Sequence, residues 1–212
     1  ITTTDNLKNW DTDPAYSDIR QKMLDGVRLP EHCSSCYKYE DLGIESYRQF
    51  ESLDWLTQLN IESFADLKNI KNPYFYELHT SNNCNIKCRG CQPTFSEPIG
   101  KEIKKFKIVT PTELKWKPLS ATIDQIDIDT LDKNSSVYFQ GGEPTIMPEV
   151  REFMRRCIAK NKTDFFLTMC TNGVKLSDEF LELVSHFSNT NFSISIDGFD
   201  RINDYWRSGS KW

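Results

Sequence analysis

The sequence predicts an α/β protein whose larger part is a parallel sheet, preceded by a small, mainly helical module that carries a cysteine pair. Three observations predict this fold. Beyond residue 73, strand patterns alternate with helical patterns, which is typical of parallel βαβ units. Each of these strands runs into a cluster of small or polar residues. Before residue 73 the apolar residues recur at helical spacing, so we divide the chain into domains 1–72 and 73–212.

The N-terminal part is expected to begin with a helix. Asp13 stands at the N-cap, Pro14 at the first helical position and Gly26 at the C-terminal stop. A loop that carries the pair Cys33 and Cys36 should follow this helix.

Further elements follow in a regular order. Two helical patterns, at 44–60 and 61–70, precede a break at 71–74. Four strands are then expected, at 74–80, 135–140, 164–171 and 191–196. Helices are expected at 147–160 and 177–187, the second with Ser177 as its N-cap. The stretch 95–133 has room for one helix and a long connection.

Alternation and helical spacing predict which side chains are buried. On the helix at 147–160 one apolar face is formed by Met147, Val150, Met154, Cys157 and Ile158. On the last strand, one face carries Phe192, Ile194 and Ile196, and the opposite face carries Ser193, Ser195 and Asp197. We expect the apolar set to pack beneath helices and the polar set to face a cleft.

Composition narrows the class of function. The 212 residues are 38% hydrophobic and 12% aromatic, which suffices for a core. The net charge of −5 argues against a general nucleic-acid binder, and no apolar run reaches the length of a membrane span. Five of the seven cysteines are clustered, Cys157 and Cys170 stand alone, and the sequence shows no secretion signal. We therefore expect the clustered cysteines to be metal ligands rather than disulfides, and a cytoplasmic location.

Three of the cysteines follow the first predicted strand in the spacing C-x3-C-x2-C, as Cys84, Cys88 and Cys91. Structural zinc sites use four protein ligands, and ferredoxin sites supply four thiolates to each cluster. His79 is the nearest candidate for a fourth ligand. The triplet is therefore either a Cys3His zinc or incomplete ferredoxin-like site, or a [4Fe–4S] site with one iron left open for catalysis.

The order of four motifs, CNIKCRGC, GGEP, TNG and SIDG, each next to a predicted strand, resembles the radical S-adenosylmethionine (SAM) superfamily. The resemblance implies a partial (β/α) TIM-like barrel, a [4Fe–4S] cluster on the three cysteines, and SAM bound to the fourth iron. It implies reductive cleavage of SAM to a 5′-deoxyadenosyl radical that takes a hydrogen from a substrate, with the protein positioning the cofactor. Reduced ferredoxin or flavodoxin would supply the electron.

The second motif contains Gly141, Gly142 and Glu143. The glycines remove side chains where the backbone must approach a ligand closely, and the resemblance assigns Glu143 to the SAM ammonium group. A plain strand-to-helix turn explains the glycines as well, but it does not explain the acid. The third motif places Asn172 on the strand face of Cys170, where it is either a turn residue before Gly173 or a ligand contact.

The fourth motif and the residues after it give the remaining SAM contacts implied by the resemblance. Ser195 and Asp197 are candidates for the ribose or carboxylate of SAM, and Arg207 for its carboxylate. Asp197 can equally belong to a turn, and Arg207 can be an ordinary exposed arginine. The chain departs from the family at Gly90, where many members have an aromatic residue that packs on adenine, so Ile86 or a later residue would have to replace it.

The segment around Cys33 and Cys36 is similar to the end of the twitch or SPASM modules that hold auxiliary iron–sulfur clusters. Two cysteines give only part of a ligand set, so zinc shared with other cysteines and a redox CxxC pair stay open as alternatives. Because the family barrel usually has six strands, we expect the chain to be a fragment. In relatives an auxiliary cluster often accompanies peptide or protein modification, so the resemblance implies a peptide or protein substrate, with carbohydrate and nucleoside substrates left open. The alternative function is a non-catalytic zinc-binding interaction module with two cysteine clusters.

Overall fold

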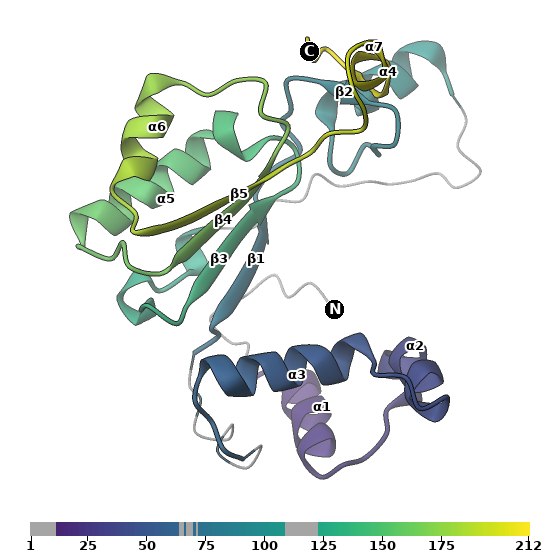
Figure 1. Cartoon of the computed structure of the whole chain (residues 1–212), viewed down its shortest axis with the longest axis vertical. Coiled ribbons are helices and arrows are strands. Elements are labelled where there is room, and N and C mark those ends of the chain that lie inside the picture. The colour runs from purple at the N-terminus through teal and green to yellow at the C-terminus, as the bar shows by residue number, and fades with distance from the viewer. Residues whose placement is uncertain (1–11, 64–65, 67–69, 71, 109–122) are drawn as a thin grey trace. The chain divides into compact units, whose positions relative to one another are not determined.

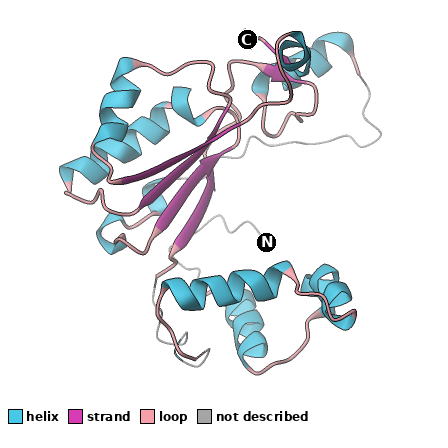
Figure 2. Cartoon of the chain, in the orientation of Figure 1, coloured by secondary structure: helices cyan, strands magenta, loops and turns pink. Residues whose placement is uncertain are grey.

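The computed structural model describes residues 12–63, 66, 70, 72–108 and 123–212. The chain divides into two compact units, residues 1–73 and 74–212, which are drawn in Figures 1 and 2. Most of the helix expected at 61–70 and part of the connection expected at 95–133 fall outside the described residues. No helix in the described ranges is long and apolar enough to cross a membrane.

The first unit contains three helices, α1 (Pro14–Leu24), α2 (Pro30–Asp41) and α3 (Tyr47–Gln58). The predicted first helix is confirmed, and Gly26 has the positive φ of 73° expected of a C-terminal stop. Helix α3 begins with a capping box, in which Ser46 and Gln49 each accept a hydrogen bond from the other's backbone N–H.

The cysteine pair of this unit lies in a helix, so the prediction of a loop is wrong. Cys33 and Cys36 belong to α2, which starts at Pro30 and leaves helical geometry only at Cys33, with φ −122° and ψ 17°. Pro30 fits the first helical turn because its missing N–H is not needed there. The Tyr37 hydroxyl accepts the Leu29 N–H at 2.9 Å and thereby satisfies a donor at the start of this helix. The sequence pattern did not reveal that tertiary contact.

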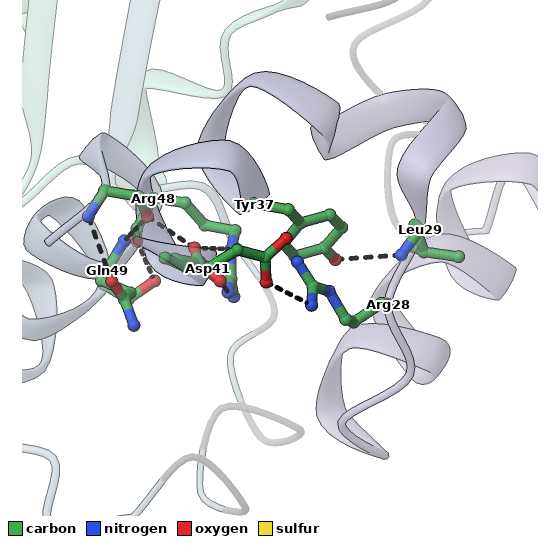
Figure 3. Close-up of polar contacts among 9 residues, drawn as sticks. Arg28, Leu29, Tyr37, Asp41, Arg48 and Gln49 are labelled. Carbon is green, nitrogen blue, oxygen red and sulfur yellow. Dashed lines mark hydrogen bonds and ion pairs between the residues drawn. The ribbon is translucent and has the colours of Figure 1, made fainter. Parts of the chain in front are cut away.

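Tyr37 is also the centre of a charged network that fixes α2 (Figure 3). Its ring lies 4.2 Å from the guanidinium of Arg28 and 5.3 Å from that of Arg48. Arg28 pairs with Asp41 at 2.7 Å, and Arg48 pairs with Glu40 at 2.8 Å. Helix α2 is therefore anchored both to the segment before it and to α3.

The second unit is built on a four-stranded parallel sheet in the order β1-β3-β4-β5, which confirms the predicted α/β fold and its four strands. The strands are β1 (Phe75–His79), β3 (Ser136–Gln140), β4 (Phe166–Thr171) and β5 (Asn189–Ile194). Helices α5 (Pro148–Ala159) and α6 (Asp178–Ser185) cover one face of the sheet (Figure 1). The Ser177 hydroxyl accepts the Phe180 N–H, which confirms it as the N-cap of α6.

Several short elements complete the second unit. Helix α4 (Glu97–Phe106) follows the cysteine loop, and helix α7 (Arg201–Trp206) follows β5. Short 3-10 turns occur at Ile123–Gln125, Ile128–Thr130 and Pro144–Ile146. Sequence reasoning missed a two-stranded antiparallel sheet made of β2 (Lys87–Cys88) and β6 (Arg207–Ser208), because two-residue strands leave no periodic pattern.

The core lies between the sheet and α5. Val150, Met154 and Cys157 on the inner face of α5 are fully buried, as predicted. Phe153 of the same helix contacts Phe139 of β3 edge to face, with ring centroids 5.4 Å apart. Because this core holds the middle strands rigidly, their C-terminal ends make a fixed platform for the loops that follow them.

On strand β5 the predicted apolar face is only partly buried. Phe192 packs on Phe180 of α6, with ring centroids 6.2 Å apart. Ile194 and Ile196 are 59% and 56% exposed, so the expectation that they pack beneath helices is wrong. The reason is topological, since β5 is an edge strand of the described sheet and ends at Ile194, so Ile196 lies beyond it.

The thiol of Cys157 should be unreactive toward alkylating reagents in the folded protein. Burial raises the pKa of its thiol to about 12, so little reactive thiolate exists at pH 8. We expect iodoacetamide to alkylate Cys157 on the order of a hundredfold more slowly than the half-buried Cys36. Peptide mapping by mass spectrometry over time measures both rates, and denaturation in urea should make them equal. Equal rates in the native protein would show that this thiol is not in the core.

Candidate functional site

The cysteine triplet lies in the loop that follows β1, next to α4, α7 and the small β2–β6 sheet (Figure 1). Cys84, Cys88 and Cys91 are all half-buried free thiols. This loop and the loops after β3, β4 and β5 leave the carboxyl ends of parallel strands, which is where α/β folds place their chemistry.

The double glycine after β3 makes contact with the cysteine loop. Gly142 N–H donates to Phe95 O at 2.9 Å, and Glu143 N–H donates to Asn83 O at 2.8 Å. A Cβ on Gly142 would lie 2.3 Å from Asn83 O. The close backbone approach predicted for this position exists, and the partner present in the structure is the chain's own loop.

The carboxylate of Glu143 is held inside the protein, where the residue is 1% exposed. Its Oε1 accepts hydrogen bonds from Thr145 Oγ1 at 2.8 Å and Thr171 Oγ1 at 2.6 Å, and a longer one from Thr145 N at 3.2 Å. Its Oε2 accepts the Asn172 N–H at 2.7 Å. These donors satisfy a carboxylate from within the chain and tie the ends of β3 and β4 together. The assignment of Glu143 to the SAM ammonium group stays a prediction.

Asn172 connects the end of β4 to the cysteine loop. Its Nδ2 donates to Asn85 Oδ1 at 2.8 Å and lies 3.9 Å from Cys84 Sγ, while its Oδ1 accepts the Val174 N–H at 2.9 Å. The following Gly173 has a φ of 68°. The residue thus makes the predicted turn and also contacts the loop that carries the thiols. Asn85 had not been singled out by its sequence pattern.

Asp197 and Arg207 lie together beside Cys88. Arg207 Nε is 2.8 Å from Asp197 Oδ2, and Arg207 Nη1 is 3.6 Å from Cys88 Sγ. Strands β2 and β6 pair Cys88 with Arg207 and Lys87 with Ser208. The structure therefore brings two predicted SAM ligands into contact with each other, and one of them, Arg207, into contact with a cysteine of the triplet.

A second contact holds the C-terminal segment on the same loop. Arg89 N–H donates to Trp206 O at 2.8 Å, Arg89 Nε donates to Tyr205 O at 2.8 Å, and the Arg89 guanidinium lies 3.9 Å from the Tyr205 ring centre. Ile86 is 2% exposed beneath Gly209, and a Cβ on Gly90 would meet no atom within 4 Å. Ile86 therefore packs within the loop, and the space beside Gly90 is open.

Ser195 lies on the sheet face opposite the helices. Its Oγ is 3.6 Å from Cys170 Sγ on the neighbouring strand β4, and both residues are half-buried. The proximity of the Cys170 thiol is one cause of the raised pKa of Tyr138, after burial. Ser195 and Cys170 therefore share a face, as strand alternation predicted, and the cleft expected on that face stays a prediction.

Burial is the largest effect on the three thiols and raises the pKa of each one. The positive charge of Arg207 opposes this effect at Cys88 and Cys91, whose pKa values it lowers. The Cys88 pKa is further raised by the charges of Cys84 and Cys91. The three sulfurs are therefore close enough to influence one another.

The donor set fits an iron–sulfur cluster, because three half-buried thiols of one short loop supply only sulfur ligands. No group of three or more His, Cys, Asp or Glu side chains in the described ranges is placed around a single metal ion. An iron–sulfur cluster requires a different arrangement of its ligands, because each thiolate binds a different iron. His79 Nε2 lies 3.3 Å from Glu77 Oε1, and its ring is tilted against that of Phe95, with ring centroids 5.2 Å apart.

The pair Cys33 and Cys36 belongs to the first unit. The two residues are three positions apart on α2, and both are half-buried. The helix distortion at Cys33 falls within the pair. Their role as ligands of an auxiliary cluster or of zinc stays a prediction.

Comparison with known proteins assigns the second unit. The family model described as the radical SAM superfamily matches residues 78–212. A cysteine-type anaerobic sulfatase-maturating enzyme of Clostridium novyi is 29% identical over 136 residues, which are 60% of this chain and 33% of that protein. The sporulation killing factor maturation protein SkfB of Bacillus subtilis is 24% identical over 135 residues, which are 64% of this chain and 29% of that protein.

Solved structures give a weaker likeness over more of the chain. SuiB of Streptococcus suis bound to S-adenosylmethionine has a TM-score of 0.42 and 18% identity, over 95% of this chain and 43% of SuiB. SuiB bound to the precursor peptide SuiA has a TM-score of 0.36 and 16% identity, over 83% of this chain and 40% of SuiB. The chain spans about a third of the length of the curated relatives it matches.

Proposed function

The chain belongs to the radical SAM superfamily, and we propose that it forms the part of a radical SAM enzyme that holds the catalytic [4Fe–4S] cluster and SAM. One observation carries the proposal. Three thiols of one loop are gathered at the carboxyl ends of a parallel sheet, and the GGE and TNG motifs both bond to that loop. A zinc module with no further chemistry would not need these two motifs to converge on it.

In this proposal Cys84, Cys88 and Cys91 bind three irons of the cluster, and SAM completes the fourth. When bound, the cluster supplies one electron that cleaves SAM to methionine and a 5′-deoxyadenosyl radical, which takes a hydrogen from the substrate. The chain's own task is to hold the thiols and SAM in place and to keep the site shielded. Asn172 contributes by fixing the loop through Asn85.

For the contacts to SAM we propose the set of residues predicted from the sequence, with two changes. Ser195 has its hydroxyl on the sheet face opposite the helices, which supports a contact to SAM. Gly141 and Asn172 stay in the proposed set because they lie beside His79 and at the cysteine loop. Both carboxylate oxygens of Glu143 are hydrogen-bonded within the chain, and the guanidinium of Arg207 is ion-paired with Asp197. We assign these two residues to positioning the loop rather than to binding SAM.

We further propose a peptide or protein substrate. The support is that two relatives are named for maturation, one of a sulfatase and one of the sporulation killing factor. Reduced ferredoxin or flavodoxin is the proposed electron donor, and a reducing cytoplasm the proposed location, because free clustered thiols suit it. Cys33 and Cys36 are proposed as part of an auxiliary iron–sulfur site.

Anaerobic reconstitution of the full-length protein with iron and sulfide tests the proposal. We expect a brown protein with about four irons per triplet site that forms 5′-deoxyadenosine from SAM when a reductant is added. Cys88→Ala should reduce this product to background, because it removes an iron ligand. Cys157→Ala, which changes a core thiol away from the site, is the matched control and should keep its iron and its product.

The zinc alternative predicts a different outcome for the same preparation. A full-length protein that stays colourless, holds zinc and never forms 5′-deoxyadenosine would overturn the radical SAM proposal. Iron and zinc are measured in one sample by elemental analysis, and the nucleoside is measured by chromatography.

A further inference from the structure

Arg207 places its guanidinium between a carboxylate and a cysteine sulfur. Its Nε lies 2.8 Å from Asp197 Oδ2, and its Nη1 lies 3.6 Å from Cys88 Sγ. The side chain is only 15% exposed. A cation held this close to a sulfur and largely covered from water acts on it with little screening by salt.

The backbone fixes this arrangement as firmly as the side chains do. Arg207 and Cys88 are direct partners in the β2–β6 ladder. On the other side, the Asp197 N–H donates to Asn203 Oδ1 at 3.1 Å, and Asn203 Nδ2 donates to Ser210 Oγ at 3.3 Å. Asn203 is 7% exposed, so this support is part of the packed segment.

The two cationic neighbours on the cysteine loop point elsewhere. Lys87 Nζ lies 3.3 Å from a carboxylate oxygen of Glu102. Arg89 is held by the backbone oxygen and the ring of Tyr205. Arg207 thus contacts a thiol of the triplet through a placement that these neighbours do not share.

We propose that Arg207, held by Asp197, is a positioning residue that orients the Cys88 ligand and raises the reduction potential of the cluster bound there. The inference rests on the proposed function. Reduction adds one electron and therefore one negative charge to the cluster, which a nearby cation stabilises. Donation to a ligating sulfur acts in the same direction, because it withdraws charge from the sulfur. No bond is formed or broken in this step.

Potentiometric titration of the reconstituted full-length protein in the absence of SAM, followed by electron paramagnetic resonance, tests the proposal. Arg207→Ala should lower the midpoint so that the reduction equilibrium shifts about tenfold, which is about 59 mV for a one-electron couple. Asp197→Asn should raise the midpoint, because the guanidinium charge is then no longer compensated. The Asp197 shift should be smaller, since that carboxylate is 46% exposed and screened by solvent.

Three further results complete the test. Arg207→Lys keeps the charge but loses the fork that reaches both partners, so we expect a midpoint between those of wild type and Arg207→Ala. Arg201→Ala removes an exposed arginine at the start of α7 and is the matched control, with an unchanged midpoint. If Arg207→Ala fails to assemble a cluster, the Asp197→Asn variant tests the proposal alone. A raised midpoint in that variant supports it, and a lowered midpoint contradicts it.

Two outcomes would overturn the proposal while leaving the proposed function intact. One is an unchanged midpoint in Arg207→Ala together with SAM binding weakened more than about tenfold, which would make Arg207 a ligand of the SAM carboxylate. The other is a shift of the same sign in Arg207→Ala and Asp197→Asn, which would indicate only structural damage. A wild-type protein that never holds a cluster would contradict the proposed function itself.

Discussion

Glu143→Gln is expected to lower the free energy of unfolding by about 2–3 kcal/mol, although it leaves the side-chain volume almost unchanged. Each oxygen of the native carboxylate faces a backbone N–H that can only donate, Oε1 that of Thr145 and Oε2 that of Asn172. A glutamine amide would turn its NH2 group toward one of these donors, so two hydrogens would meet where one hydrogen bond existed. Since the residue is 1% exposed, water cannot reach the unpaired groups to replace the lost hydrogen bond.

Urea unfolding of the second unit, followed by circular dichroism, measures this effect. Glu149→Gln is the matched control, because it is the same substitution at an exposed position in the first turn of α5. We expect the control to lower the free energy of unfolding by only a few tenths of a kcal/mol, because it removes a negative charge that interacts favourably with the helix dipole. If Glu143→Gln unfolds like wild type but binds SAM more weakly, the carboxylate serves the SAM ammonium, as the sequence motif predicted.

The stability effect should reach the cysteine loop. Glu143 holds the Asn172 N–H, and the Asn172 side chain in turn donates to Asn85 within that loop. A buried carboxylate with several donors holds these segments together firmly, because a hydrogen bond to a charged acceptor is stronger than a hydrogen bond to a neutral one. The acid of the motif can therefore act on the thiols without touching SAM.

Sequence patterns predicted those structural features that depend on residues close together in the chain. The strands of the sheet, the cap at Ser177 and the buried face with Cys157 all follow from the spacing of residues near one another in the chain. The three thiols and the GGE motif stand out because their residue types have few structural reasons to occur together.

The partners of those residues could not be predicted in the same way. Arg207 meets Cys88 across 119 positions, and Thr171 meets Glu143 across 28. A serine, threonine or arginine is commonplace in a sequence, and only the folded chain shows what it contacts. The helix around Cys33 was missed for a similar reason, because the Tyr37 hydroxyl that supports its start acts through a tertiary contact.

Gly142→Ala is expected to have the largest effect on the second unit, at about 3–5 kcal/mol of lost stability. Two causes add. The residue has a φ of 55°, which costs an alanine about 1–2 kcal/mol. Its new Cβ would also lie 2.3 Å from Asn83 O, a backbone atom that cannot rotate away. The cysteine loop must move, and the bond from Gly142 N–H to Phe95 O is lost with it.

Gly173→Ala separates these two causes. Gly173 also has a positive φ, of 68°, but a Cβ there would meet Ile194 Cγ2 at an ordinary 3.4 Å. It should therefore cost only the backbone strain, about 1–2 kcal/mol. The difference between the two variants in urea unfolding measures how tightly the motif after β3 is fitted to the cysteine loop. Equal losses would mean that the loop yields freely and that the glycine is needed for its conformation alone. A much larger loss at Gly142 would show that it is needed because the two backbones touch.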